Sequence, residues 1–159
     1  MAKRSKSTVY FASAVPERID RDLTLPARFK RLLEKTGLRE RVRGRRVAIK
    51  MHLGGGVGYS TIHPFFVRLL VDFIRTGKPR DVFVTDNAWK DVDRRGYARQ
   101  TIGARIVPTL GRDGRSFRRI PTGWPVLPEV EVGAPFLKAD FLVNFSHIKG
   151  HGDCGFGGA

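Results

Sequence analysis

Arg46-Val-Ala-Ile-Lys-Met-His52 is the stretch of sequence that decides the fold. Its apolar residues and its length are typical of a buried strand, and a glycine-rich segment follows it directly. From His63 to Gly77, apolar side chains recur at helical spacing, with Pro64 in its favoured early position. Residues 81–86 then return to a strand pattern. This strand–helix–strand order predicts a unit with two parallel strands.

The flanking sequence continues the same alternation of strands and helices. It predicts strands at 7–14, 104–108 and 138–146, helices at 26–37 and 92–102, and an excursion over 111–135 that holds one antiparallel hairpin. We therefore predict an α/β fold, a mostly parallel sheet with helices on both faces. We expect a single domain over 1–159, truncated at its C-terminal end because no helix follows the last strand and its glycine-rich loop.

The charge of the chain favours anionic partners. The 159 residues include thirty Lys and Arg and fifteen Asp and Glu, so the formal net charge is +15. Such a surface attracts nucleic acids, and it equally suits a protein that handles small anionic ligands. The sequence contains no zinc finger, no RNP-type aromatic strand and no helix-turn-helix, so the small-ligand interpretation is preferred.

The lengths of the hydrophobic segments indicate whether the chain could cross or enter a membrane. The longest apolar runs have the length of strands, far below the roughly 20 residues that cross a membrane. The basic N-terminus is followed by a short apolar run that is a poor signal peptide. We therefore expect a cytoplasmic protein with no membrane partner.

Polar residues gather where the predicted strands end. His52 ends one strand, Asp86 and Asn87 end the next, and His147 follows the last. Ligands of open parallel sheets bind beyond the carboxyl ends of the strands, so this pattern predicts a binding crevice there. Asp86 could bind a metal or a ribose, or could cap the next helix. Lys50 and His52 alternate along their strand, so they share one face, which could be a site or simply exposed.

A glycine-rich loop follows His52. The amides of Gly54, Gly55 and Gly56 could approach a phosphate, close to the positive end of the next helix. The loop matches neither the Walker pattern nor Gly-x-Gly-x-x-Gly. A plain connection explains it equally well.

Side chains that can act in catalysis or bind metals are densest in the closing segment, His147-Ile-Lys-Gly-His-Gly-Asp-Cys-Gly-Phe-Gly-Gly-Ala159. Imidazole acts as an acid, a base or a metal ligand near neutral pH, and lysine holds anions. We predict His147, Lys149 and His151 as catalytic residues. The spacing also resembles a metal site formed by His147, His151 and Cys154. A purely structural loop is the third interpretation.

Together these residues predict one crevice with two walls. Lys50, His52, Gly54, Gly55, Gly56, Asp86 and Asn87 would form one wall, and Gly155, Gly157 and Gly158 would hold the cofactor on the other. The predicted ligand is an anionic small molecule or a metal- or phosphate-containing cofactor. A nucleic-acid-binding module without catalysis is the alternative.

Several motifs resemble the domain of unknown function 362 family over residues 45–159. They are Val47-Ala-Ile-Lys-Met-His-Leu-Gly54, His63-Pro-Phe-Phe-Val-Arg-Leu-Leu-Val71, Val84-Thr-Asp-Asn87, Ser146-His-Ile-Lys-Gly-His151 and Gly155-Phe-Gly-Gly-Ala159. The resemblance implies an association with ferredoxin-type [4Fe-4S] modules and a redox role. Because Cys154 is the only cysteine, the cluster would belong to chain not present here, in a ferredoxin-type domain or partner protein.

The closing segment also resembles the lactate racemase family, whose members hold a nickel-pincer nucleotide. His151 would match that family's histidine, and the matching lysine would fall beyond Ala159. This second resemblance implies an isomerase rather than a redox enzyme.

Overall fold

A four-stranded parallel sheet forms the centre of the molecule. The computed structural model describes residues 6–54, 61–87 and 90–158. The strand order is β3-β2-β1-β6, with bounds Arg105–Pro108, Asp81–Asp86, Arg46–Lys50 and Phe141–Asn144. β1 pairs in parallel with both β2 and β6, so the stretch from Arg46 lies in the middle of the sheet. The predicted α/β fold with a parallel sheet is confirmed.

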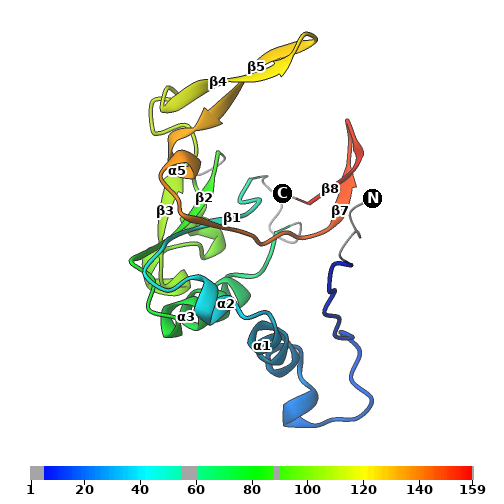
Figure 1. Ribbon diagram of the computed structural model, residues 1–159. Helices are drawn as coiled ribbons and strands as arrows, with labels where there is room; N and C mark the ends of the chain where they lie inside the picture. Colours follow the sequence, from blue (N-terminus) through cyan, green and yellow to red (C-terminus); the bar gives the residue numbers. More distant parts are fainter. Residues whose placement is uncertain (1–5, 55–60, 88–89, 159) are drawn as a thin grey trace.

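Helices cover one face of this sheet. Val47 and Ile49 of β1 are fully buried on the face that meets α1 (Leu25–Lys35), α2 (Leu38–Arg41) and α3 (Pro64–Thr76) (Figure 1). α3 contributes the most to this core, through Val67, Leu70, Val71, Phe73 and Ile74. Each such side chain stabilises the fold by about 1.5–3 kcal/mol when it leaves water. A short 3-10 helix, η1 (Arg21–Leu23), precedes α1.

α3 begins and ends at the predicted residues. The backbone N–H of Phe65 donates to Nδ1 of His63 at 3.2 Å, so this histidine caps the helix. Pro64 takes the first helical position and Gly77 follows the last. His63 therefore has a structural role at the helix start.

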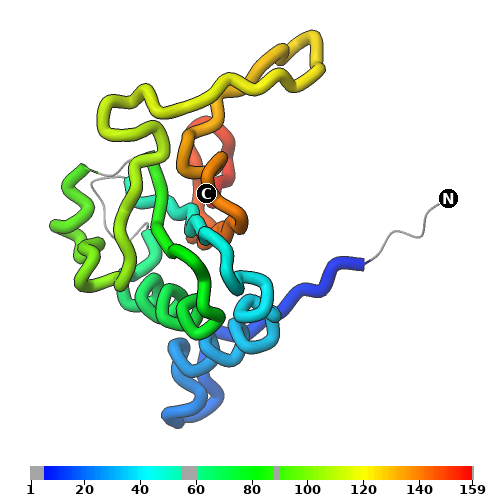
Figure 2. Tube along the Cα trace, turned by 60° about the vertical axis from the view of Figure 1, so that its left-hand side comes forward, coloured from blue at the N-terminus to red at the C-terminus, as the bar shows by residue number. Residues whose placement is uncertain are grey.

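The opposite face of the sheet is covered much less. The one-turn helix α5 (Ala134–Leu137) lies above it, and β4 (Phe117–Trp124) and β5 (Leu127–Gly133) form an antiparallel arm that projects from the body (Figures 1 and 2). The predicted hairpin within 111–135 is confirmed. β6 is an edge strand of this sheet, and its Leu142 is half exposed.

The strand predicted at 7–14 is wrong. This segment forms no strand, and Figure 2 shows it running out from the body. Val9 and Phe11 are 85% and 86% exposed. A strand needs a neighbour to pair its backbone donors and acceptors, and the β-branched and aromatic composition does not supply one.

Two further segments differ from the prediction. Gly96, at a φ of 82°, divides the helix predicted over 92–102 into η3 (Asp93–Arg95) and α4 (Arg99–Ile102). A left-handed residue cannot continue a helix. The closing segment is a small antiparallel hairpin of β7 (Lys149–His151) and β8 (Gly155–Gly157) rather than an irregular loop. No helix in the described part of the chain is long and apolar enough to cross a bilayer.

Replacing Gly77 should test the contact between α2 and α3. A Cβ on Gly77 would lie 2.4 Å from the Arg39 carbonyl oxygen and 2.6 Å from a Val42 methyl group. Gly77→Ala should therefore lower the free energy of unfolding by about 1–3 kcal/mol, measured by urea denaturation. Gly152→Ala, with open space around its Cβ, should change it by less than about 0.5 kcal/mol. Equal losses would contradict this packing.

Candidate site at the carboxyl ends of the strands

A buried carboxylate joins the ends of β1 and β2. Oδ2 of Asp86 accepts a hydrogen bond from the backbone N–H of Leu53 at 2.7 Å. Its Oδ1 lies 3.3 Å from Nζ of Lys50. The Asp86 side chain is 10% exposed and that of Lys50 is 22% exposed, so water screens this ion pair only weakly. Asp86 thus holds both a cation and the first residues after β1.

Lys50 is held from a second direction. Its Nζ donates to the carbonyl oxygen of Met51 at 2.7 Å. The strand pattern that places Lys50 on the sparsely covered face also places it beside Asn144 of β6 in the register. Lys50 is therefore a fixed positive charge at the carboxyl end of the sheet.

Arg95 belongs to the same site, although the sequence did not indicate it. Its guanidinium donates to the carbonyl oxygens of Leu53 and Gly54, the second bond at 3.3 Å. It also lies 5.7 Å from the centre of the Tyr97 ring. Arg95 sits among other charged residues in η3, where nothing in the sequence separates it from a surface arginine.

His52 lies between these charges. Burial lowers the pKa of His52 below its ordinary value of 6.5, and the positive charge of Lys149 lowers it further. Lys50 and Arg95 act in the same direction, while the carboxylate of Asp86 opposes them. The neutral imidazole is therefore favoured at pH 7, because burial and cations from three different elements oppose its protonation.

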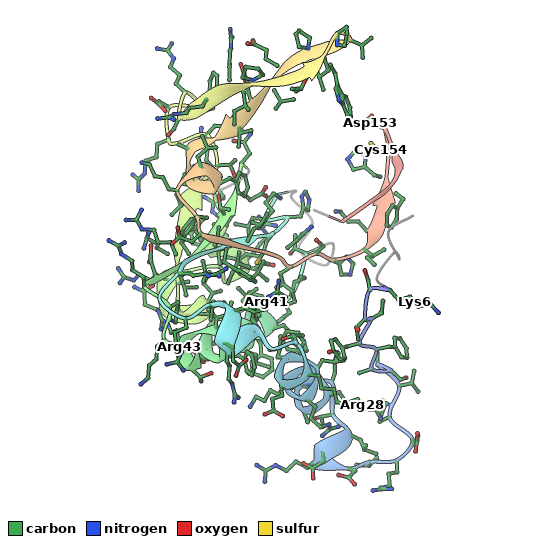
Figure 3. The ribbon with its side chains drawn as sticks, viewed as in Figure 1. Lys6, Arg28, Arg41, Arg43, Asp153 and Cys154 are labelled. Carbon is green, nitrogen blue, oxygen red and sulfur yellow. The ribbon has the colours of Figure 1, made fainter. Side chains whose placement is uncertain are left out.

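The β7–β8 hairpin brings Lys149 to this site and leaves His151 in a different role. Nδ1 of His151 accepts hydrogen bonds from the backbone amides of Asp153 and Cys154, at 3.2 and 3.3 Å. This nitrogen therefore shapes the turn. Figure 3 shows Asp153 and Cys154 at the outer end of the hairpin, and Cys154 is exposed.

The structure thus brings together some of the predicted residues. Lys50, His52, Asp86 and Lys149 form one electrostatic group, and Gly54 is buried beside Arg95. His147 and Asn87 are exposed next to this group in sequence. Gly55 and Gly56 lie outside the described residues.

The closing glycines pack against neighbouring side chains. A Cβ on Gly157 would lie 3.3 Å from the His151 ring, and one on Gly158 would lie 3.3 Å from Cβ of Ser146. Gly155 has a φ of 68° and starts β8 after the turn. Tight packing and turn geometry therefore account for glycine at these three positions.

The metal site predicted for His147, His151 and Cys154 finds no support. Within 6–54, 61–87 and 90–158, no three or more His, Cys, Asp or Glu side chains are grouped to hold a metal ion. A [4Fe-4S] cluster usually needs four ligands, mostly cysteine, and the sequence has a single cysteine. The residues present do not fit such a cluster.

A family model described as "Domain of unknown function (DUF362)" matches residues 47–159. The chain belongs to the DUF362 family. The match begins in β1 and includes every residue of the carboxyl-end site. The resemblance inferred from the sequence motifs is therefore confirmed for DUF362. No curated protein and no solved structure matches the chain.

Removing the buried carboxylate should destabilise this DUF362 chain. Asp86→Ala leaves the Leu53 amide without its acceptor and Lys50 without its carboxylate partner, and should lower the free energy of unfolding by about 2–4 kcal/mol. Asp72 is the matched control, because its ion pair with Arg68 at 2.7 Å is about half exposed. Asp72→Ala should cost at most about 1 kcal/mol in the same urea titration. Comparable losses of unfolding free energy in the two variants would show that Asp86 does not stabilise the junction of β1 and β2.

The titration of His52 should respond to Lys149. Lys149→Gln removes a cation that disfavours the imidazolium, so the pKa of His52 should rise, measured by NMR of the imidazole protons. Lys35→Gln, on α1, should leave it unchanged. An unchanged pKa in Lys149→Gln would place the hairpin away from His52.

The lowered pKa of His52 also predicts how the stability of the fold changes with pH. The folded pKa of His52 lies below 6.5, so the unfolded chain takes up this proton first as the pH falls. His52 should therefore destabilise the native state below pH 6.5, and His52→Gln should flatten this part of the stability profile. The midpoint of urea unfolding against pH measures the difference.

Proposed function

We propose that the carboxyl-end site binds an anionic small molecule and that His52 moves a proton to or from it. One observation carries the proposal. A neutral imidazole lies among Lys50, Lys149 and Arg95, with Asp86 as the opposing carboxylate. Perturbed titration beside a specific set of charges is a feature of functional sites.

The charges favour an anion over a cation. Asp86 already pairs with Lys50, and its second oxygen is used by the Leu53 amide. Lys149 and Arg95 add positive charge that this carboxylate does not balance. A bound carboxylate or phosphate would lower the repulsion among these groups, because opposite charges within a few ångströms attract strongly where water is scarce.

Anion binding also prepares His52 for proton transfer. A negative charge beside the imidazole favours the imidazolium and raises its pKa toward neutrality, where a general acid or base works best. Lys149 would hold the anionic group while His52 takes the proton from an adjacent carbon or oxygen and returns it. Isomerisation and redox reactions, the two classes that the family resemblances imply, both use such a step.

In this scheme the closing hairpin contributes mainly Lys149. His151 shapes the turn, and His147 would approach the ligand from the end of β6. The site differs from a phosphate-binding glycine loop in that its positive charge comes from side chains of β1, η3 and β7.

A titration with simple anions tests the proposal. Inorganic phosphate and acetate should raise the pKa of His52, followed by NMR of its imidazole protons. Lys149→Gln should weaken the apparent phosphate affinity about tenfold or more, since a charge-assisted bond is lost. Lys35→Gln should bind as the wild type does. A pKa of His52 that neither anion changes would falsify the proposal.

Nucleic-acid binding is the rival function, and the net charge of +15 favours it. A single-stranded and a double-stranded 20-mer test it by fluorescence anisotropy at several salt concentrations. Steep weakening with salt, together with unchanged affinity in His151→Ala and Lys149→Gln, would favour the rival. Weak binding of both 20-mers with intact phosphate binding would favour the anion site.

A further inference from the structure

A second cationic hollow lies on the sheet face opposite the helices. It is a groove of about 610 Å³ between the sheet and α5. That volume falls within the range of small-molecule sites, about 300–1,000 Å³. It shares no residue with the carboxyl-end site. Most of its sheet residues come from the amino-terminal halves of β1, β2 and β3.

The charged residues of this groove are mostly cationic. Among the described residues, four arginines and a lysine line it against a single carboxylate: Arg46, Arg80, Arg105, Arg112 and Lys138, with Asp81. Arg105 binds Asp81 through two hydrogen bonds, at 2.8 and 2.6 Å. The one carboxylate is therefore bonded to one guanidinium, and Arg46, Arg80 and Lys138 give the groove an excess of positive charge.

The groove also has an apolar wall. Val107 and Pro108 of β3 and Ala134 of α5 are partly exposed in it, while Phe83 and Pro135 are buried. The Arg105 guanidinium lies over the Phe83 ring, 5.3 Å from its centre. Apolar and cationic surfaces thus lie within one ligand's length of each other.

We propose that this groove binds a nucleoside phosphate. The base packs against the partly exposed side chains of Val107, Pro108 and Ala134, and the phosphates bind Arg46, Arg80 and Lys138. Guanidinium groups bind phosphate oxygens in pairs, which suits arginine better than lysine for this task. A bare inorganic anion would leave the apolar wall in water, and an uncharged ring would leave the cations without partners.

Fluorescence anisotropy of a ribose-labelled adenosine triphosphate tests the proposal on the full chain. The double variant Arg80→Ser/Lys138→Ser should weaken binding about tenfold or more. The double variant Arg43→Ser/Arg118→Ser removes the same charge elsewhere, because Arg43 lies after α2 on the helical side (Figure 3) and Arg118 lies on the arm. This control should change the affinity less than twofold.

A charge-neutral variant separates a shaped groove from general attraction. Ala134→Phe places a ring in the groove without changing the charge, and should abolish nucleotide binding. Unlabelled adenosine triphosphate should compete at least tenfold better than inorganic tripolyphosphate. A circular dichroism spectrum like that of the wild type confirms that Ala134→Phe folds.

Four results would overturn the proposal. They are no binding at millimolar nucleotide, equal weakening by the two double variants, equal competition by tripolyphosphate, and full binding by folded Ala134→Phe. Loss of binding in Lys149→Gln would place the nucleotide at the carboxyl-end site instead. A single-stranded 20-mer that binds Ala134→Phe as it binds the wild type would indicate surface attraction to nucleic acid.

Discussion

Parallel pairing of β1 on both sides is the constraint on which the rest of the structure depends. Because β2 and β6 run in the same direction as β1, their carboxyl ends reach one edge of the sheet. Lys50, Asp86 and the segment that leads to Lys149 meet there for that reason alone. The backbone bonds of β1 are satisfied on both sides, and Val47, Ala48 and Ile49 are fully buried. The edge is therefore built on a central, buried strand of the sheet.

The carboxyl-end site is defined mainly by the positions of its charged side chains. Asp86 fixes Lys50 and the Leu53 amide, and Arg95 fixes the next two carbonyl groups. These bonds hold the chain after β1 in place on both sides. They leave His52 uncharged in a positive environment. This arrangement is the basis on which we propose an anionic ligand and proton transfer by His52.

The two faces of the sheet differ in what they can do. Three helices cover most of one face, and its buried side chains form the core that stabilises the fold. The other face has only α5 and the base of the arm above it, and this incomplete cover leaves the cationic groove. The arginine residues therefore differ in what their positive charge can do, depending on where they lie. Part of it lies in this groove beside Val107 and Ala134, and part lies on the helices and the arm.

The sequence by itself determined the βαβ unit, the start and end of α3, the presence of a hairpin within 111–135 and the DUF362 membership, because each depends on a local pattern or motif. It also indicated Lys50, His52 and Asp86, since strand ends in a parallel sheet share an edge. Only the tertiary structure decided that Arg95 joins them and that Ser7 to Ala14 stays unpaired, because both depend on contacts between residues far apart in the chain. The role of His151 was likewise decided by the tertiary structure. Its Nδ1, which the sequence suggested as a metal ligand, accepts hydrogen bonds from two backbone amides of the turn.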